Sequence, residues 1–297
     1  MVSHSFILIH KMAEMRNIKE LLSTGMATEG NLLIAKKILD TLVEEVNKRL
    51  IPRTEAALVI GPSMIPGSSI DVDRETPNTL SVREVGEGAD IILDNQSYTS
   101  VNIKPKKYGV GIRITNEMLE DGKWNLLERN IMTAAKRFAE NETNLILTQL
   151  DSAATVNAGG AAYQVSDLTT QMQDLEDSDY NPTTLLVGNE VLHDLRNIDT
   201  FVEANKLGSR EMLETGFVGK IYGLNVMRFS TNAAPSSAYS KYAYVFDNTQ
   251  AYYIAEKRPL TVERFDLQSN DMKAATITQR IAVQIIRTQA VSKTTTE

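Results

Sequence analysis

A glutamate and a histidine three residues apart form the most metal-like pair in the sequence. Glu190 and His193 lie in the segment EVLHDLRN, and on a helix both side chains would share one face. A zinc site needs further ligands, but the other histidines, His4 and His10, lie near the start of the chain. The sequence has no cysteine, which removes thiolate ligands, cysteine nucleophiles and disulfides. We therefore expect a solvated helix face and no metal.

Three carboxylates in the segment TNEMLEDG form a second candidate cluster. Glu117, Glu120 and Asp121 would share a helix face, yet carboxylates in a first helical turn also complement the helix dipole without any catalytic role. The segment VGEGADI lacks the third glycine and the helix that would present amides to a phosphate, and no G-x-S-x-G surrounds Ser63. A triad assembled in space stays open, but we expect no catalytic residue and no cofactor.

Length, charge and hydropathy limit the classes of protein to which this chain can belong. A chain of 297 residues with 42% hydrophobic residues is long enough for one large domain or two ordinary ones. Its net charge of -7 argues against DNA binding by phosphate neutralisation, although such a protein can enclose nucleic acid. The apolar run from Phe6 to Ile9 is too short for a signal peptide or a membrane span, so we expect an unexported protein with no membrane partner.

Hydrophobic periodicity predicts the elements that position these residues. Apolar residues three and four apart indicate helices over 31–50, ended by Pro52, and over about 116–150. Alternation predicts strands around Val110 and in KRPLTVERF and ATITQRIAVQIIRTQAV, which we expect to pair and to pack on the second helix. Residues 151–250 alternate short strands such as TTLLVGN with short helices, which predicts an inserted α+β lobe.

A long hairpin is predicted between residues 70 and 104, with VGEGADI as its turn. Arms of about 15 residues would reach about 50 Å, whereas a compact chain of this length has a radius of gyration near 19 Å. An isolated two-stranded ribbon is marginal in water. We therefore expect this hairpin to lie on another copy of the chain.

The segment KPKKYGVGIRITNEMLEDG and the following helix NLLERNIMTAAKRFAENETNLIL resemble the junction of extended loop and spine helix in the major capsid proteins of tailed phages and related archaeal viruses. These proteins have the Hong Kong 97 fold. EVGEGADI is similar to the family's loop, GKIYGLNV to its small-lobe turn, and YIAEKRPLTVERF with TQRIAVQIIRTQAV to its closing strands. The resemblance covers roughly Pro52 to Val291.

This resemblance implies an α+β chain in four parts. They are an N-terminal arm and helix at 1–51, the first part of a peripheral domain at 52–150, an axial domain at 151–250, and peripheral closing strands with a C-terminal tail at 251–297. The first peripheral part would hold the extended loop at about 70–104 and the spine helix at about 116–150. Pro105, which has no amide donor, would end the pairing of the loop strands.

The implied function is structural and non-enzymatic. Copies of the chain would form pentamers and hexamers of an icosahedral virion shell, assembled in the host cytoplasm around double-stranded DNA that is not bound by sequence. Separate scaffolding, portal or decoration proteins would be further partners. Any scaffolding is expected to come from another protein, because only about 30 residues precede the first helix. Inter-subunit contacts are expected at exposed charges of the loop and of the corner after it: Arg83, Glu84, Glu87, Asp90, Lys104, Lys106 and Lys107.

Two alternatives and one departure from the family stay open in the sequence. The alternatives are an encapsulin-type nanocompartment shell, which would contain cargo enzyme rather than genomic DNA, and an α+β enzyme with a spatially assembled site. Some family members cross-link through a loop lysine, but no lysine occurs between Lys48 and Lys104. We therefore expect a shell without this isopeptide bond, and a ladder of covalent multimers on a denaturing gel would contradict that expectation.

Overall fold

The computed structural model describes residues 52–76, 80–88, 90–115, 117, 126–198, 217–267 and 271–296. The helix expected over 31–50 and most of the start of the helix expected over 116–150 lie outside these residues. The chain divides into two compact units, of which the second comprises Lys48–Tyr108, Phe138–Pro259 and Gln279–Glu297. The division into arm, peripheral and axial domains stays a prediction.

A long helix is present where the apolar periodicity predicts one. Helix α4 (Leu126–Ala153) has 28 residues and therefore extends about 42 Å. Its buried Ile146, Leu147 and Leu150 pack in one core cluster with Ile254 and Ile281 of the closing strands. This confirms the expectation that these strands pack on the helix.

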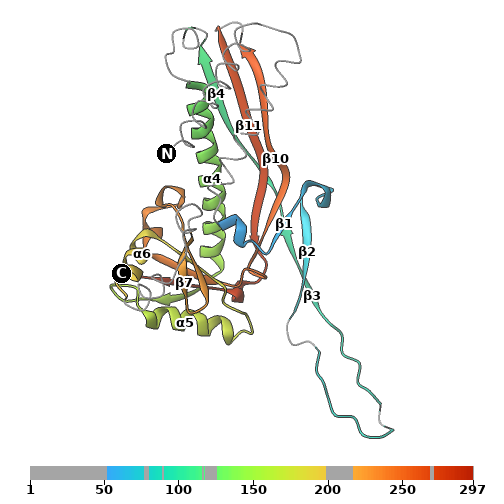
Figure 1. The fold of residues 1–297 in the computed structure, drawn as a ribbon. Helices are drawn as coiled ribbons and strands as arrows, with labels where there is room; N and C mark the ends of the chain where they lie inside the picture. Colours follow the sequence, from blue (N-terminus) through green and yellow to red (C-terminus); the bar gives the residue numbers. More distant parts are fainter. Residues whose placement is uncertain are drawn as a thin grey trace, which may run out of the picture. The chain divides into compact units, whose positions relative to one another are not determined.

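The closing strands form a four-stranded sheet with the strand around Val110. The strand order is β1 (Leu58–Ile60), β10 (Tyr252–Leu267), β11 (Met272–Ile285) and β4 (Lys106–Thr115) (Figure 1). β1 runs parallel to β10, with Leu58 opposite Tyr253. The short 3-10 helix η1 (Pro52–Glu55) precedes β1. Four others connect strands: η2 (Pro62–Met64), η4 (Thr231–Ala233), η5 (Ser237–Lys241) and η7 (Thr288–Ala290).

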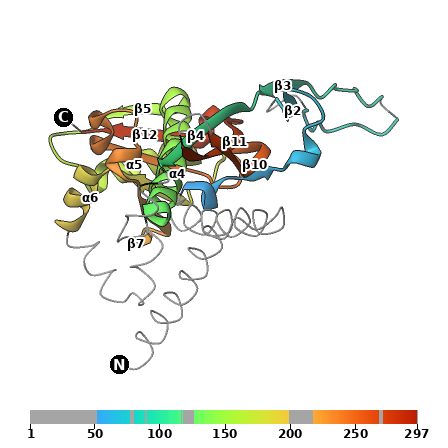
Figure 2. The same ribbon diagram turned by 90° about the horizontal axis from the view of Figure 1, so that it is seen from above.

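A six-stranded sheet lies in the second unit. Its order is β5 (Thr155–Ala158), β12 (Val291–Thr295), β9 (Tyr242–Phe246), β6 (Thr184–Val187), β8 (Leu224–Arg228) and β7 (Phe217–Ile221). Figure 2 shows β5 and β12 side by side, as their parallel pairing requires. Helices α5 (Val165–Glu176) and α6 (Asn189–Arg196) complete this α+β part. The last strand, β12, thus joins this sheet, in a segment that the sequence had predicted to be the C-terminal tail after the closing strands.

The central strand β6 and the turn between β7 and β8 are two features of this sheet with a local physical cause. β6 pairs with β8 and β9 at its two edges. All four of its residues are buried, because Leu186 packs in one core cluster while Leu185 and Val187 pack in another. Between β7 and β8, Tyr222 and Gly223 have φ angles of 48° and 86°. A two-residue hairpin turn of type I′ needs positive φ at both central positions, so Gly223 suits its place.

The predicted hairpin is present but its paired part is short. β2 (Ile70–Glu75) and β3 (Tyr98–Ile103) are antiparallel, with Ile70 opposite Ile103 and Glu75 opposite Tyr98. The backbone of Thr76 still donates to the carbonyl of Ser97 at 3.0 Å, but the described residues from 80 to 97 contain no strand. The expected length of about 15 paired residues in each arm was wrong. A two-stranded ribbon is stable only where other parts of the protein cover one of its faces.

Candidate functional site

The loop between β2 and β3 exposes a group of large apolar side chains. Each of its five members exposes at least 61% of its surface: Leu80, Val82, Ile91, Ile92 and Leu93. Single exposed apolar residues are ordinary, but several within one short loop are typical of an interaction surface. The described part of this loop is therefore the candidate site for contact with another protein chain.

One carboxylate joins the two sides of this loop. Asp94 accepts hydrogen bonds from the backbone nitrogen and the hydroxyl of Ser81, at 3.1 and 2.9 Å. Its other oxygen lies 3.3 Å from the guanidinium of Arg83. The hydrogen bonds from Ser81, together with Arg83, hold the pKa of Asp94 below its usual value. The lowered pKa favours the ionised carboxylate of Asp94. The exposed apolar residues lie on both sides of the loop that this carboxylate joins.

The base of the hairpin is anchored by a small hydrophobic cluster. Ile103 is buried, and Val72 and Val101 pack against the same cluster, whose other buried members are Ile60, Ile65, Ala255 and Ile286. Two arginines add bonds to backbone carbonyls: Arg74 donates to Ile286 at 2.7 Å and Arg287 to Glu75 at 3.4 Å. The hairpin therefore has a fixed base and an exposed loop, which suits a segment that contacts a second chain.

The structure places six of the seven predicted contact residues at the surface without a described partner. These are Glu84, Glu87, Asp90, Lys104, Lys106 and Lys107, and none of the described ion pairs includes any of them. Arg83 differs, because its guanidinium is paired with Asp94. Pro105 lies between the end of β3 and the start of β4, where it was expected to end the strand pairing. The contact role of the seven residues stays a prediction.

The apolar residues on the returning side of the loop were not among the contact residues predicted from the sequence. Ile91, Ile92 and Leu93 follow one another directly in the sequence. Three consecutive large apolar residues do not alternate, so a search for strand periodicity passes over them. A run of large apolar residues directly after a predicted turn was the feature of the sequence that could have indicated this surface.

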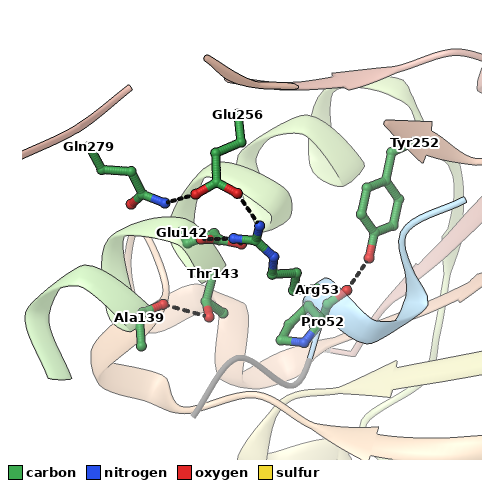
Figure 3. Close-up of polar contacts among 8 residues, drawn as sticks. All are labelled: Pro52, Arg53, Ala139, Glu142, Thr143, Tyr252, Glu256 and Gln279. Atoms are coloured by element: carbon green, nitrogen blue, oxygen red, sulfur yellow. Dashed lines mark hydrogen bonds and ion pairs between the residues drawn. The ribbon is translucent and has the colours of Figure 1, made fainter. Parts of the chain in front are cut away.

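A second polar group lies in the same unit, around the guanidinium of Arg53 (Figure 3). Nη1 of Arg53 lies 3.1 Å from both carboxylate oxygens of Glu142, and Nη2 lies 2.5 Å from Glu256. Nε2 of Gln279 donates to the other oxygen of Glu256 at 3.0 Å. The arrangement joins η1, α4, β10 and β11 through side chains far apart in the sequence.

This group is short of positive charge. Glu142 is 1% exposed, and burial raises its pKa to about 7 even though Arg53 favours the ionised form, while Glu256 raises the pKa further. Burial alone would lower the pKa of Arg53, but the charges of Glu142 and Glu256 outweigh it and raise the pKa. The single guanidinium of Arg53 thus forms ion pairs with two carboxylates, those of Glu142 and Glu256.

Further hydrogen bonds hold η1 beside this group. The hydroxyl of Tyr252 donates to the carbonyl of Pro52 (Figure 3), and burial raises the pKa of Tyr252, which keeps the hydroxyl protonated. The buried carboxylate of Glu55 accepts from the hydroxyl of Thr184 at 2.6 Å and from the amide of Asn248 at 3.3 Å. Every side-chain and backbone contact of η1 named here lies within the second unit.

The candidate metal and carboxylate clusters do not form sites in the described part of the chain. Glu190 accepts a hydrogen bond from the hydroxyl of Ser240 at 2.5 Å, and His193 is exposed. Glu117 is exposed, whereas Glu120 and Asp121 lie outside the described residues. No group of three or more histidines and carboxylates in the described ranges is arranged to hold a metal, and none of the described helices is long and apolar enough to cross a membrane.

Comparisons with known proteins connect this architecture to virus particles. A family model described as "Phage capsid protein" matches residues 98–291. A search of curated proteins finds no match for the chain. Among solved structures, a chain of Microbacterium phage Oxtober96 is similar with a TM-score of 0.60 and 14% identity, covering 81% of this chain and 90% of that one.

Two further solved structures extend the comparison beyond that phage. The capsid of a native GTA particle, computed with C5 symmetry, gives a TM-score of 0.63 at 12% identity and covers 84% of this chain and 90% of that chain. A virus-like particle from Pyrococcus furiosus gives a TM-score of 0.56 at 15% identity, covering 87% and 98% respectively. Identities this low show a shared fold.

Proposed function

The chain belongs to the phage capsid protein family and has the Hong Kong 97 fold, and we propose that it assembles through pentamers and hexamers into an icosahedral shell around double-stranded DNA. Its role is structural and not enzymatic, and its place is the capsid of the virion. Assembly in the host cytoplasm is part of the proposal. Family membership also sets aside the alternative of an α+β enzyme.

The exposed apolar loop is the observation that carries this proposal. Burying one large apolar side chain stabilises a contact by about 1.5–3 kcal/mol, and the loop offers five that its own subunit leaves exposed. We expect this loop to pack on a neighbouring copy of the chain. In a closed shell each subunit both gives and receives such a contact, so many modest contacts add to a stable particle.

The exposed charges are proposed to set the orientation of that contact. Glu84, Glu87 and Asp90 give the loop three negative charges, and Lys104, Lys106 and Lys107 give the corner after the hairpin three positive charges. Complementary surface charges select partners and fix the register of an interface more than they add affinity. In this proposal the two groups of charges meet groups of opposite sign on neighbouring copies.

The overall charge bears on what the shell contains. A net charge of -7 disfavours tight binding to phosphates, because such binding draws its free energy from counterion release at basic side chains. We therefore propose that DNA is enclosed without sequence-specific contacts. Separate scaffolding, portal or decoration proteins are further proposed partners.

An encapsulin-type nanocompartment is the second candidate, and the similarity to the virus-like particle from Pyrococcus furiosus favours it. Such a shell would enclose protein cargo. Particles purified from the natural source and treated with nuclease separate the two candidates: protected double-stranded DNA supports the viral shell. A co-purified enzyme without protected DNA would instead establish the nanocompartment.

A further inference from the structure

We propose that the buried cluster of Arg53, Glu142 and Glu256 takes up one proton in the folded subunit below neutral pH, so that mild acidification stabilises the junction of η1, α4 and β10. The inference concerns a single subunit and goes beyond the proposed shell function. It depends on contacts inside the second unit only.

The charge count at the cluster motivates this inference. The groups that face Glu142 are Arg53 from η1, Glu256 and Tyr252 from β10, and the neutral Gln279 from β11. With both carboxylates ionised the cluster has one positive and two negative charges. A single proton would leave one guanidinium paired with one carboxylate, and the buried excess charge would be gone.

Burial decides which carboxylate takes the proton. The side chain of Glu142 is 2% exposed, whereas those of Glu256 and Arg53 are 16% and 22% exposed. Removing a carboxylate from water disfavours its charged form, so the proton resides on Glu142. Its raised pKa of about 7 agrees with this assignment.

The sign of the pH effect follows from the two states. The pKa of Glu142 is about 7 in the folded chain against an ordinary value of 4.5, so the folded chain binds more protons than the unfolded chain between these values. The stabilisation is complete below about pH 4.5 and is lost as the pH rises through 7. One proton changes the folding equilibrium constant by at most about tenfold per pH unit in this range.

Infrared spectroscopy of the full chain tests the proton directly. The carbonyl band of a protonated carboxyl group should disappear with a midpoint near pH 7 in the wild type and should be missing from Glu142→Gln. Glu256→Gln removes the second negative charge, so its midpoint should move to lower pH. The exposed Glu176, at the end of α5, provides the control Glu176→Gln, which should behave as the wild type does.

Each outcome decides the inference. A wild-type protein without a carboxyl band that titrates above pH 6, or a band that persists in Glu142→Gln, overturns it. Should Glu142→Gln fail to fold, as judged by circular dichroism, the midpoint of Glu256→Gln decides, and an unchanged or higher midpoint overturns the inference. Urea unfolding supplies a second measurement, in which the loss of stability from pH 5 to pH 7 should flatten in Glu142→Gln.

Discussion

Asp94 accepts two hydrogen bonds from Ser81 across the loop between β2 and β3, one from the backbone nitrogen at 3.1 Å and one from the hydroxyl at 2.9 Å. These bonds join the outgoing and returning sides of a loop whose residues lie outside the regular strands. They lie beside the apolar residues that we propose for contact with a neighbouring subunit. The hydrogen bonds between Asp94 and Ser81 therefore fix the conformation of the proposed contact loop before a neighbouring subunit binds.

Replacing Asp94 should weaken assembly more than folding. Asp94→Ala removes both bonds from Ser81 and the ion pair with Arg83, so the loop has more conformational entropy to lose on binding. We expect slower particle formation in light scattering and an unchanged circular dichroism melting curve. Asp177→Ala, at an exposed residue after α5, is the matched control. A large loss of melting temperature in Asp94→Ala would show that the link serves the fold instead.

A charge placed among the exposed apolar residues should stop assembly. Val82→Asp leaves the subunit core intact because Val82 is fully exposed, but the carboxylate would have to be desolvated in the proposed contact. We expect a folded subunit that stays below particle size in size-exclusion chromatography. Val82→Ile keeps the apolar surface and should assemble. Particles of Val82→Asp in normal yield would contradict the role of the loop.

Reversal of the basic corner should impair assembly in a salt-dependent manner. Lys104, Lys106 and Lys107 are exposed, so the triple change to glutamate should leave the monomer folded while it repels acidic groups on a neighbour. The triple change to arginine retains the charge and should assemble. Electron microscopy at low and moderate salt measures the difference, which screening should reduce. Unimpaired particles of the glutamate variant would count against the assignment.

A glycine at the start of α6 should be intolerant of a side chain. A Cβ at Gly188 would lie 2.3 Å from the carbonyl oxygen of Ser240 and 2.4 Å from that of Tyr239. Backbone atoms must shift to relieve this overlap, and overpacking typically costs about 1–3 kcal/mol. Gly188→Ala should therefore lower the free energy of unfolding in urea, whereas Gly160→Ala, where no atom lies within 4 Å, should leave it nearly unchanged. Equal stability of the two variants would contradict the close packing.

The elements with strong local patterns could be predicted from the sequence. The run TTLLVGN became β6 and EVLHDLRN became α6. Of the spaced apolar residues of α4, Ala135, Phe138 and Leu150 are buried. Each of these patterns reports which face of a single element is buried, and that information is local. The tight turn in GKIYGLNV was readable for the same reason, since Gly223 permits its positive φ.

Tertiary placements could not be read from local patterns. The strand Val291–Thr295 contains the buried Lys293, which pairs with Asp151 and lies 3.7 Å above the ring of Tyr242. Nothing in its own residues says which sheet it joins. The same holds for Arg53, whose carboxylate partners are 89 and 203 residues away in the sequence. Such long-range pairs emerge only when the whole chain is folded.

Electron cryomicroscopy of particles formed by the full chain tests the central claim most directly. We predict closed shells with pentamers and hexamers, in which Leu80, Val82 and Leu93 pack on a neighbouring subunit and lose their exposure. A chain that remains monomeric at high concentration would contradict the account. So would particles in which residues 80–97 touch only their own subunit.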